Sequence, residues 1–186
     1  MQRLRVFMAE MVELSPGRRG ALATAGVLLL AACNPFAPAL DDVPTDPNKL
    51  LGNPVTVQGF FERFRASYQL RDSTLYGQLL ARPFTFTFRD FANNVDRSWN
   101  RDVEVNTTYR LFQAARTANL QWTQYLPTSD TAFSDTLAYV ERSFSLTIEQ
   151  RDNQTFTGAG SARLVLVRKS RQDPWRMRSW YDRSEF

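Results

Sequence analysis

The hydrophobic pattern after residue 53 predicts two helices at the start of a folded domain. Asn53 and Pro54 form an N-cap followed by proline at the first helical position, which favours a helix start here. Apolar residues then recur at the spacing of one face of an amphipathic helix of about 17 residues. They are Val57, Phe60, Phe61, Phe64 and Tyr68. A second helix is expected over 73–81, because Pro83 disfavours helical geometry just before it. Its inward-facing residues are Leu75, Tyr76, Leu79 and Leu80.

Alternation of apolar and polar residues predicts strands over most of the remaining chain. Residues 84–88, FTFTF, place three phenylalanines on one face of a strand. A third helix is expected from a cap at Ser98, with Trp99 and Val103 on one face, and Thr107 caps its continuation. From residue 117 the period is two, which predicts a long antiparallel meander. Its features are strands at 117–125, 138–149, 162–167 and 175–182, a hairpin at Asp152-Asn153, and a bulge or bend at Gly158 and Gly160.

Helices followed by a meander predict an α+β fold, with helices packed on one face of a curved antiparallel sheet. This order, together with the aromatic last strand WRMRSWYD from Trp175 to Asp182, resembles the nuclear transport factor 2-like (NTF2-like) superfamily. That superfamily has the cone-shaped fold also found in ketosteroid isomerases and polyketide cyclases. The resemblance covers residues 54–184 and rests on element order rather than on a catalytic motif, so it implies a fold and not an activity.

The first 33 residues have the layout of a secretory leader. Arg18-Arg19 supplies the positive charge, and residues 21–30 form the apolar core. With Ala31-Ala32 the apolar stretch is about a dozen residues long, shorter than the roughly 20 needed to span a bilayer. The tetrapeptide Leu30-Ala31-Ala32-Cys33 resembles the lipobox of bacterial lipoproteins, in which the cysteine is acylated and becomes the new amino terminus. The alternative is an ordinary signal peptide with an incidental cysteine.

The lipobox resemblance implies a domain organisation and a location. Residues 1–33 would be the signal peptide, the proline-rich residues 34–53 a tether, and residues 54–186 the NTF2-like domain. Acyl chains such as palmitate on Cys33 would hold the protein to a lipid membrane of the cell envelope. By the sorting rule of two-membrane bacteria, Asn34 favours the outer membrane over the inner one. Because Cys33 is the only cysteine, its acylation leaves no thiol for a disulfide.

Composition narrows the chemistry further. The formal net charge of +4 includes four arginines of the leader, and 19 basic and 17 acidic residues remain after it. The arginines are scattered, so no nucleic acid partner is expected. The chain contains no histidine, which excludes histidine metal ligands and histidine general bases. No phosphate-loop or dinucleotide fingerprint occurs, so no cofactor and no metal is predicted.

No catalytic residue is assigned from the sequence, but several side chains are candidates for a pocket inside the cone. The resemblance implies that active members of the superfamily place a carboxylate base there, often with a tyrosine. The pocket candidates are Tyr76, Asp90, Trp99, Asp102, Glu104, Tyr109 and Trp122. Glu141, Glu149 and Tyr125 are further candidates for the same roles. The alternative is that the carboxylates are solvated or paired with nearby arginines, and that the aromatic residues are core.

Three functions follow as hypotheses. The first is a membrane-tethered, non-catalytic domain that binds a small apolar ligand or acts as a scaffold. The second is an isomerase or dehydratase acting on a hydrophobic substrate, which requires Asp90, Asp102 or Glu104 to point into the cone within reach of a tyrosine. The third is a protein-interaction module that forms a homodimer through the open face of the sheet, although polar residues such as Glu141 and Ser143 argue against a large apolar interface.

Overall fold

The computed structural model describes residues 51–131 and 133–184. The predicted signal peptide, lipobox and nearly all of the tether lie outside these residues. The elements are α3 (Val57–Gln69), α4 (Ser73–Leu79), β1 (Leu80–Asp90), β2 (Val95–Asn100), α5 (Arg101–Ala114), β3 (Ala115–Tyr125), β4 (Leu137–Gln150), β5 (Thr155–Val167) and β6 (Arg176–Asp182). No helix among them is long and apolar enough to cross a membrane.

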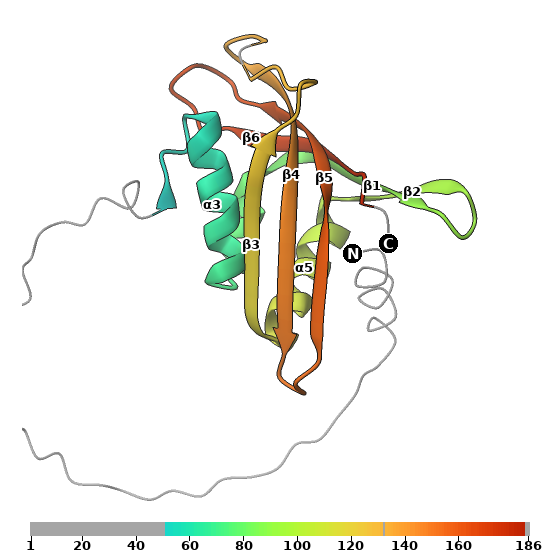
Figure 1. Ribbon diagram of the computed structural model, residues 1–186. Helices are drawn as coiled ribbons and strands as arrows, with labels where there is room; N and C mark the ends of the chain where they lie inside the picture. Colours follow the sequence, from blue (N-terminus) through green and yellow to red (C-terminus); the bar gives the residue numbers. More distant parts are fainter. Residues whose placement is uncertain (1–50, 132, 185–186) are drawn as a thin grey trace, which may run out of the picture.

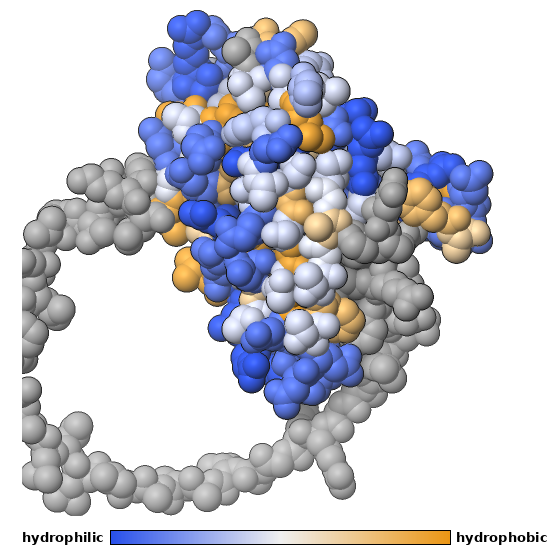
Figure 2. Space-filling model, in the orientation of Figure 1, coloured by the Kyte–Doolittle hydropathy of each residue, from blue (hydrophilic) through white to orange (hydrophobic). Residues whose placement is uncertain are grey.

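The strands form one six-stranded sheet in the order β2-β1-β6-β5-β4-β3. The chain makes the β1–β2 hairpin, crosses through α5 to the far edge, and returns by the meander from β3 to β6. This return places β6 beside β1 in parallel, so the sheet is mixed rather than wholly antiparallel as expected. Helix α5 lies behind β3, β4 and β5 and helix α3 lies beside β3, while the β1–β2 hairpin projects to one side (Figure 1). The opposite face of these strands shows mostly neutral and hydrophilic residues (Figure 2).

The core lies between the helices and the curved sheet, and aromatic side chains dominate it. The predicted stripe of α3 faces inward: Phe60, Phe61, Phe64 and Tyr68 are at most 3% exposed, and Val57 is partly buried. The three phenylalanines of the FTFTF segment are buried as predicted. In β4, the even-numbered residues are buried and the odd-numbered ones are mostly only partly buried, as the period of two requires.

The first helix begins three residues later than predicted. Thr56 is its N-cap, and the Thr56 side chain accepts a hydrogen bond from the Gly59 amide at 2.9 Å. Asn53 instead closes a turn, in which its side chain accepts from the Val55 amide and its carbonyl accepts from the Thr56 amide. Pro54 therefore lies in this turn rather than at the first helical position, because the Thr56 cap satisfies the helix start.

The third predicted helix is present as α5, but its predicted start at Ser98 is wrong, because residues 95–100 form strand β2. Asn94 has φ of 53° in the turn after β1, and the reversed chain pairs along β1 up to Thr85 opposite Asn100. Asn100 rather than Ser98 caps α5, and α5 continues through Thr107 without interruption. Trp99 packs on Phe86 with ring centroids 4.5 Å apart, whereas Val103 is 47% exposed. Strand pairing and aromatic burial outweigh the local capping signal here.

The bulge predicted at Gly158 and Gly160 is also absent from the described strands. β5 begins at Thr155 and pairs with β4 without a register shift from Leu137 to Glu149. Gly160 serves close approach instead, since a Cβ at this position would lie 2.2 Å from the Ser184 hydroxyl oxygen. The register shifts occur in the pairings of β6 with β5 and with β1, and in the pairing of β3 with β4.

Candidate functional site

A buried carboxyl group inside the cone is bound by two aromatic side chains from different elements. Glu104 of α5 is 1% exposed. The Tyr76 hydroxyl of α4 donates to its Oε1 at 2.5 Å, and the Trp99 indole N–H of β2 donates to its Oε2 at 2.6 Å. The structure therefore brings together three of the predicted pocket residues, which are 28 positions or fewer apart in sequence. We call Tyr76, Trp99 and Glu104 the interior cluster.

The side of α5 that packs against the core explains why Glu104 faces inward and Asp102 does not. The buried residues of α5 are Glu104, Thr108, Leu111 and Phe112, which recur at helical spacing, so Glu104 heads the core-facing stripe. Asp102 lies on the exposed side of the same first turn. Both positions near the helix N-terminus favour a carboxylate. Burying a carboxyl group is costly unless it is hydrogen-bonded, and the two donors compensate for this cost.

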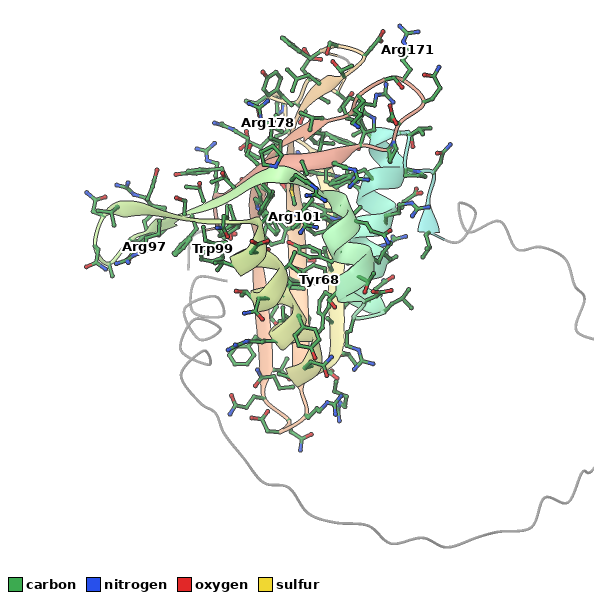
Figure 3. All side chains as sticks on the ribbon, turned by 180° about the vertical axis from the view of Figure 1, so that it is seen from behind. Tyr68, Arg97, Trp99, Arg101, Arg171 and Arg178 are labelled. Atoms are coloured by element: carbon green, nitrogen blue, oxygen red, sulfur yellow. The ribbon has the colours of Figure 1, made fainter. Side chains whose placement is uncertain are left out.

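Aromatic rings enclose the interior cluster. Tyr76 lies edge-on to Phe64 and Tyr68, with centroids 5.5 and 6.0 Å away, and Trp99 lies against Phe86 and Phe88 (Figure 3 labels Tyr68 and Trp99). The described residues line three cavities, which have volumes of about 480, 560 and 40 Å³. None of the three is lined by a member of the interior cluster.

The remaining pocket candidates do not join the interior cluster. Asp90 lies at the end of β1, where it accepts from Asn93 and pairs with Arg97 at 2.7 Å. These two partners, Asn93 first, lower the pKa of Asp90 to about 2. Tyr109 is 48% exposed on α5. Trp122 packs against Phe61, Phe64 and Phe144 beside the small cavity.

The two strand carboxylates are paired with arginines on the outer face of the sheet. Glu141, 3% exposed, accepts from the Thr128 hydroxyl at 2.6 Å and pairs with Arg163 and Arg183 at 3.1 Å each. Burial alone would raise the pKa of Glu141, but the Thr128 hydrogen bond and the two guanidinium groups outweigh it and lower the pKa. Glu149 pairs with Arg116, which lowers its pKa as well. Both glutamates are thus paired with arginines, as the alternative interpretation expected. Their partners come from other strands or from the end of the chain, and are not the arginines adjacent to them in sequence.

Arg142 is a buried cation that the sequence reasoning missed. It is 8% exposed, its guanidinium lies 4.7 Å from the Phe61 ring centroid and 4.4 Å from that of Tyr125, and it donates to the Thr123 carbonyl. Desolvation lowers its pKa. It lines the 40 Å³ cavity together with Trp122, whose indole nitrogen has no hydrogen-bond partner among the described atoms. The sequence did contain a signal for this burial, because Arg142 occupies an even-numbered position of β4, where the alternation predicts residues that face the core.

The described residues hold no group of three histidine, cysteine, aspartate or glutamate side chains that could bind a metal ion. The interior cluster offers one carboxyl group with neutral donors. Chemically, such a group can orient a bound molecule or exchange a proton with it.

No protein-family model matches the sequence, and no curated protein matches it. Solved structures share its fold. An NTF2-like protein of unknown function from Rhodospirillum rubrum is 14% identical with a TM-score of 0.54, over 70% of this chain and 98% of that chain. An NTF2-like superfamily protein from Salmonella enterica is 18% identical with a TM-score of 0.51, over 68% and 87%. A candidate scytalone dehydratase from Novosphingobium aromaticivorans is 11% identical with a TM-score of 0.59, over 70% and 83%. These similarities confirm the predicted NTF2-like α+β fold.

Proposed function

We propose that this protein is a lipid-anchored, non-catalytic lipoprotein of the cell envelope, whose NTF2-like domain acts as a compact scaffold on the membrane. The observation that carries the non-catalytic part is the interior cluster. Its carboxyl oxygens are occupied by Tyr76 and Trp99, and aromatic rings surround it. In this proposal Glu104 links α4, β2 and α5 rather than acting on a substrate.

The anchoring part rests on the lipobox sequence at Leu30 to Cys33. The test is metabolic labelling of cells with an alkyne fatty acid, followed by membrane fractionation. The native chain should carry the label in the membrane fraction, and Cys33→Ser should lose it. Thr45→Ala, a change in the tether, is the control and should be labelled as the native chain is. Labelling that survives Cys33→Ser would refute the anchor.

The closed interior is tested by an apolar dye whose emission rises in hydrophobic cavities. The proposal expects no saturable binding, and no change in the emission of the core tryptophans when apolar ketones are added. Saturable binding that Glu104→Gln abolishes would refute the closed interior and the scaffold role, and turnover of the bound ketone would refute the non-catalytic part. As a control, Tyr109→Phe alters a tyrosine that is 48% exposed and should leave the result unchanged.

A second candidate function is an isomerase- or dehydratase-type enzyme acting on a hydrophobic substrate. The specific observation in its favour is the 2.5 Å contact between the Tyr76 hydroxyl and Glu104, which pairs a carboxyl group with a tyrosine inside the cone. The solved structure of the candidate scytalone dehydratase shares this fold. The enzyme hypothesis expects turnover of an aromatic or cyclic ketone that is lost in Glu104→Gln while the variant stays folded.

A further inference from the structure

A second feature of the molecule lies far from the interior cluster. A cavity of about 560 Å³ is formed where the β5–β6 loop meets the start of β1. Its polar lining consists of four cations and one carboxylate: Arg82, Arg168, Lys169, Arg176 and Asp173. We call this the basic cavity. Figure 3 shows Arg171 of the same loop and Arg178 of β6 at this end of the molecule. Arg171 is paired with Asp135 at 2.7 Å, whereas the lining of the basic cavity holds four cations and one carboxylate.

Arg168 builds the wall of the basic cavity. Its Nη1 donates to the carbonyls of Val55 and Arg171 at 2.8 and 2.9 Å, and its guanidinium lies 4.2 Å from the Trp175 ring centroid. Asp173 accepts from the Ser170 hydroxyl at 2.7 Å. With these contacts the loop is held in place without using the other cations.

The other three cations are available to a ligand. Arg82, Lys169 and Arg176 are exposed, and none forms an ion pair with a carboxylate of residues 51–131 or 133–184. Elsewhere on the domain, exposed arginines such as Arg97 and Arg116 are paired with carboxylates. Unpaired arginine and lysine side chains around one cavity are suited to phosphate oxygens, which accept charge-assisted hydrogen bonds.

The chain enters the domain beside the basic cavity. The Trp175 amide donates to the Pro54 carbonyl at 2.9 Å, and Arg168 binds the Val55 carbonyl, so the first described residues lie against the cavity wall. Seventeen residues separate Cys33 from Leu51, a length that spans at most about 60 Å when fully extended. A chain fixed at Cys33 can therefore turn this end toward the surface without the tether passing around the domain.

We propose that the basic cavity binds the phosphate groups of anionic lipid headgroups and thereby orients the domain on the membrane. The inference rests on the proposed anchoring through Cys33. Attraction between cations and an anionic surface decays within about 8 Å at physiological salt, so the cations act only when this end faces the lipid. Each lysine or arginine near such a surface strengthens binding about fivefold. Tethering makes the contact intramolecular, so weak headgroup binding is sufficient.

The test uses the chain from residue 33 onward with Cys33→Ser, so that no acyl chain contributes. This shortened chain retains every residue of the hydrophobic core, which lies between Phe60 and Trp180. Binding is measured by flotation with phosphatidylcholine vesicles that contain or lack phosphatidylglycerol. The test variant is Arg82→Gln/Lys169→Gln/Arg176→Gln. The matched control, Arg110→Gln/Arg116→Gln/Arg151→Gln, removes the same charge from the opposite end, where the Arg151 amide bonds the Ala114 carbonyl.

The phosphatidylglycerol-dependent binding should fall about 100-fold in the test variant and by less than about threefold in the control. Equal losses in both variants, or no loss in the test variant, would overturn the proposal. Saturable binding of inorganic phosphate by a chain that does not float with the phosphatidylglycerol vesicles would assign the cavity to a soluble phosphate compound, and would also overturn the proposal. Because every chain in this assay lacks Cys33, its outcome is independent of acylation, which the fatty-acid labelling tests separately.

Discussion

If Glu104 is a structural link, then removing either of its hydrogen-bond donors should destabilise the domain by an amount that the contacts predict. Tyr76→Phe keeps the ring in its fully buried site and removes only the hydroxyl that donates to Glu104 at 2.5 Å. A hydrogen bond to a charged group contributes about 1.5–3 kcal/mol, and no cavity is created, so this range is the expected loss.

Two substitutions at Glu104 separate the contributions of charge and acceptor. Glu104→Gln can place its amide oxygen toward the Trp99 N–H and its amide nitrogen toward the Tyr76 hydroxyl, so it should cost about 1–2 kcal/mol. Glu104→Leu leaves the buried Tyr76 hydroxyl without this acceptor, at a cost of about 1–3 kcal/mol, and the partly buried Trp99 N–H at a smaller cost. The apolar side chain of leucine partly offsets these costs.

The assay is urea unfolding followed by far-ultraviolet circular dichroism. With a slope of about 2 kcal/mol per molar urea, a loss of 2 kcal/mol lowers the midpoint by about 1 M. The double variant Tyr76→Phe/Glu104→Leu should lose less than the sum of its parts, with a coupling of about 0.5–3 kcal/mol, because both changes disrupt one contact. Tyr109→Phe on the exposed side of α5 is the control and should stay within about 0.5 kcal/mol of the native chain.

A Glu104→Leu variant as stable as the native chain would refute this reasoning. Replacing a buried polar network by apolar residues is often neutral or stabilising, and that result would mean the carboxyl group is retained for a reason other than stability. It would favour the enzyme hypothesis over the scaffold.

Three further predictions concern the packing, a helix cap and the pH dependence of stability. Gly160→Ala should cost about 1–3 kcal/mol, because the new Cβ would lie 2.2 Å from the Ser184 hydroxyl oxygen, whereas Gly77→Ala, whose nearest neighbour would be 3.8 Å away, should be neutral or stabilising in thermal unfolding; equal effects would contradict the close approach. Asn100→Ala should cost about 1 kcal/mol in urea unfolding and Ser98→Ala much less, because Asn100 accepts from the Val103 amide at 3.1 Å; the reverse order would restore the cap at Ser98. The folded pKa of Glu141 lies below its ordinary value of 4.5, so its pairing contributes stability above that pH and loses it as the pH falls. Glu141→Gln should therefore flatten the acid side of the stability curve below about pH 5, and parallel curves for variant and native chain would exclude the pairing as the cause.

Periodicity alone determined the apolar face of α3, the strand with three phenylalanines and the inward face of β4. These features could be predicted because a helix or a strand buries residues at a regular spacing, and Phe60, Phe64, Phe86 and Leu146 obey it. The order of the elements was enough to predict the NTF2-like fold. The same periodicity could have predicted the burial of Arg142, because Arg142 is at an even-numbered position on the core-facing side of β4.

Only the tertiary structure decided where the chemistry lies. Tyr76, Trp99 and Glu104 were candidates among others, and no local property distinguishes Glu104 from Asp102, two residues away on the same turn. The distinction depends on which side of α5 packs against the core, and Trp99 joins the cluster because β2 pairs with β1 instead of starting a helix. Likewise, Arg82 and Arg176 are 94 positions apart and share a cavity because β6 returns beside β1 in parallel. Contacts between distant segments are set by packing and strand pairing, which local sequence does not encode residue by residue.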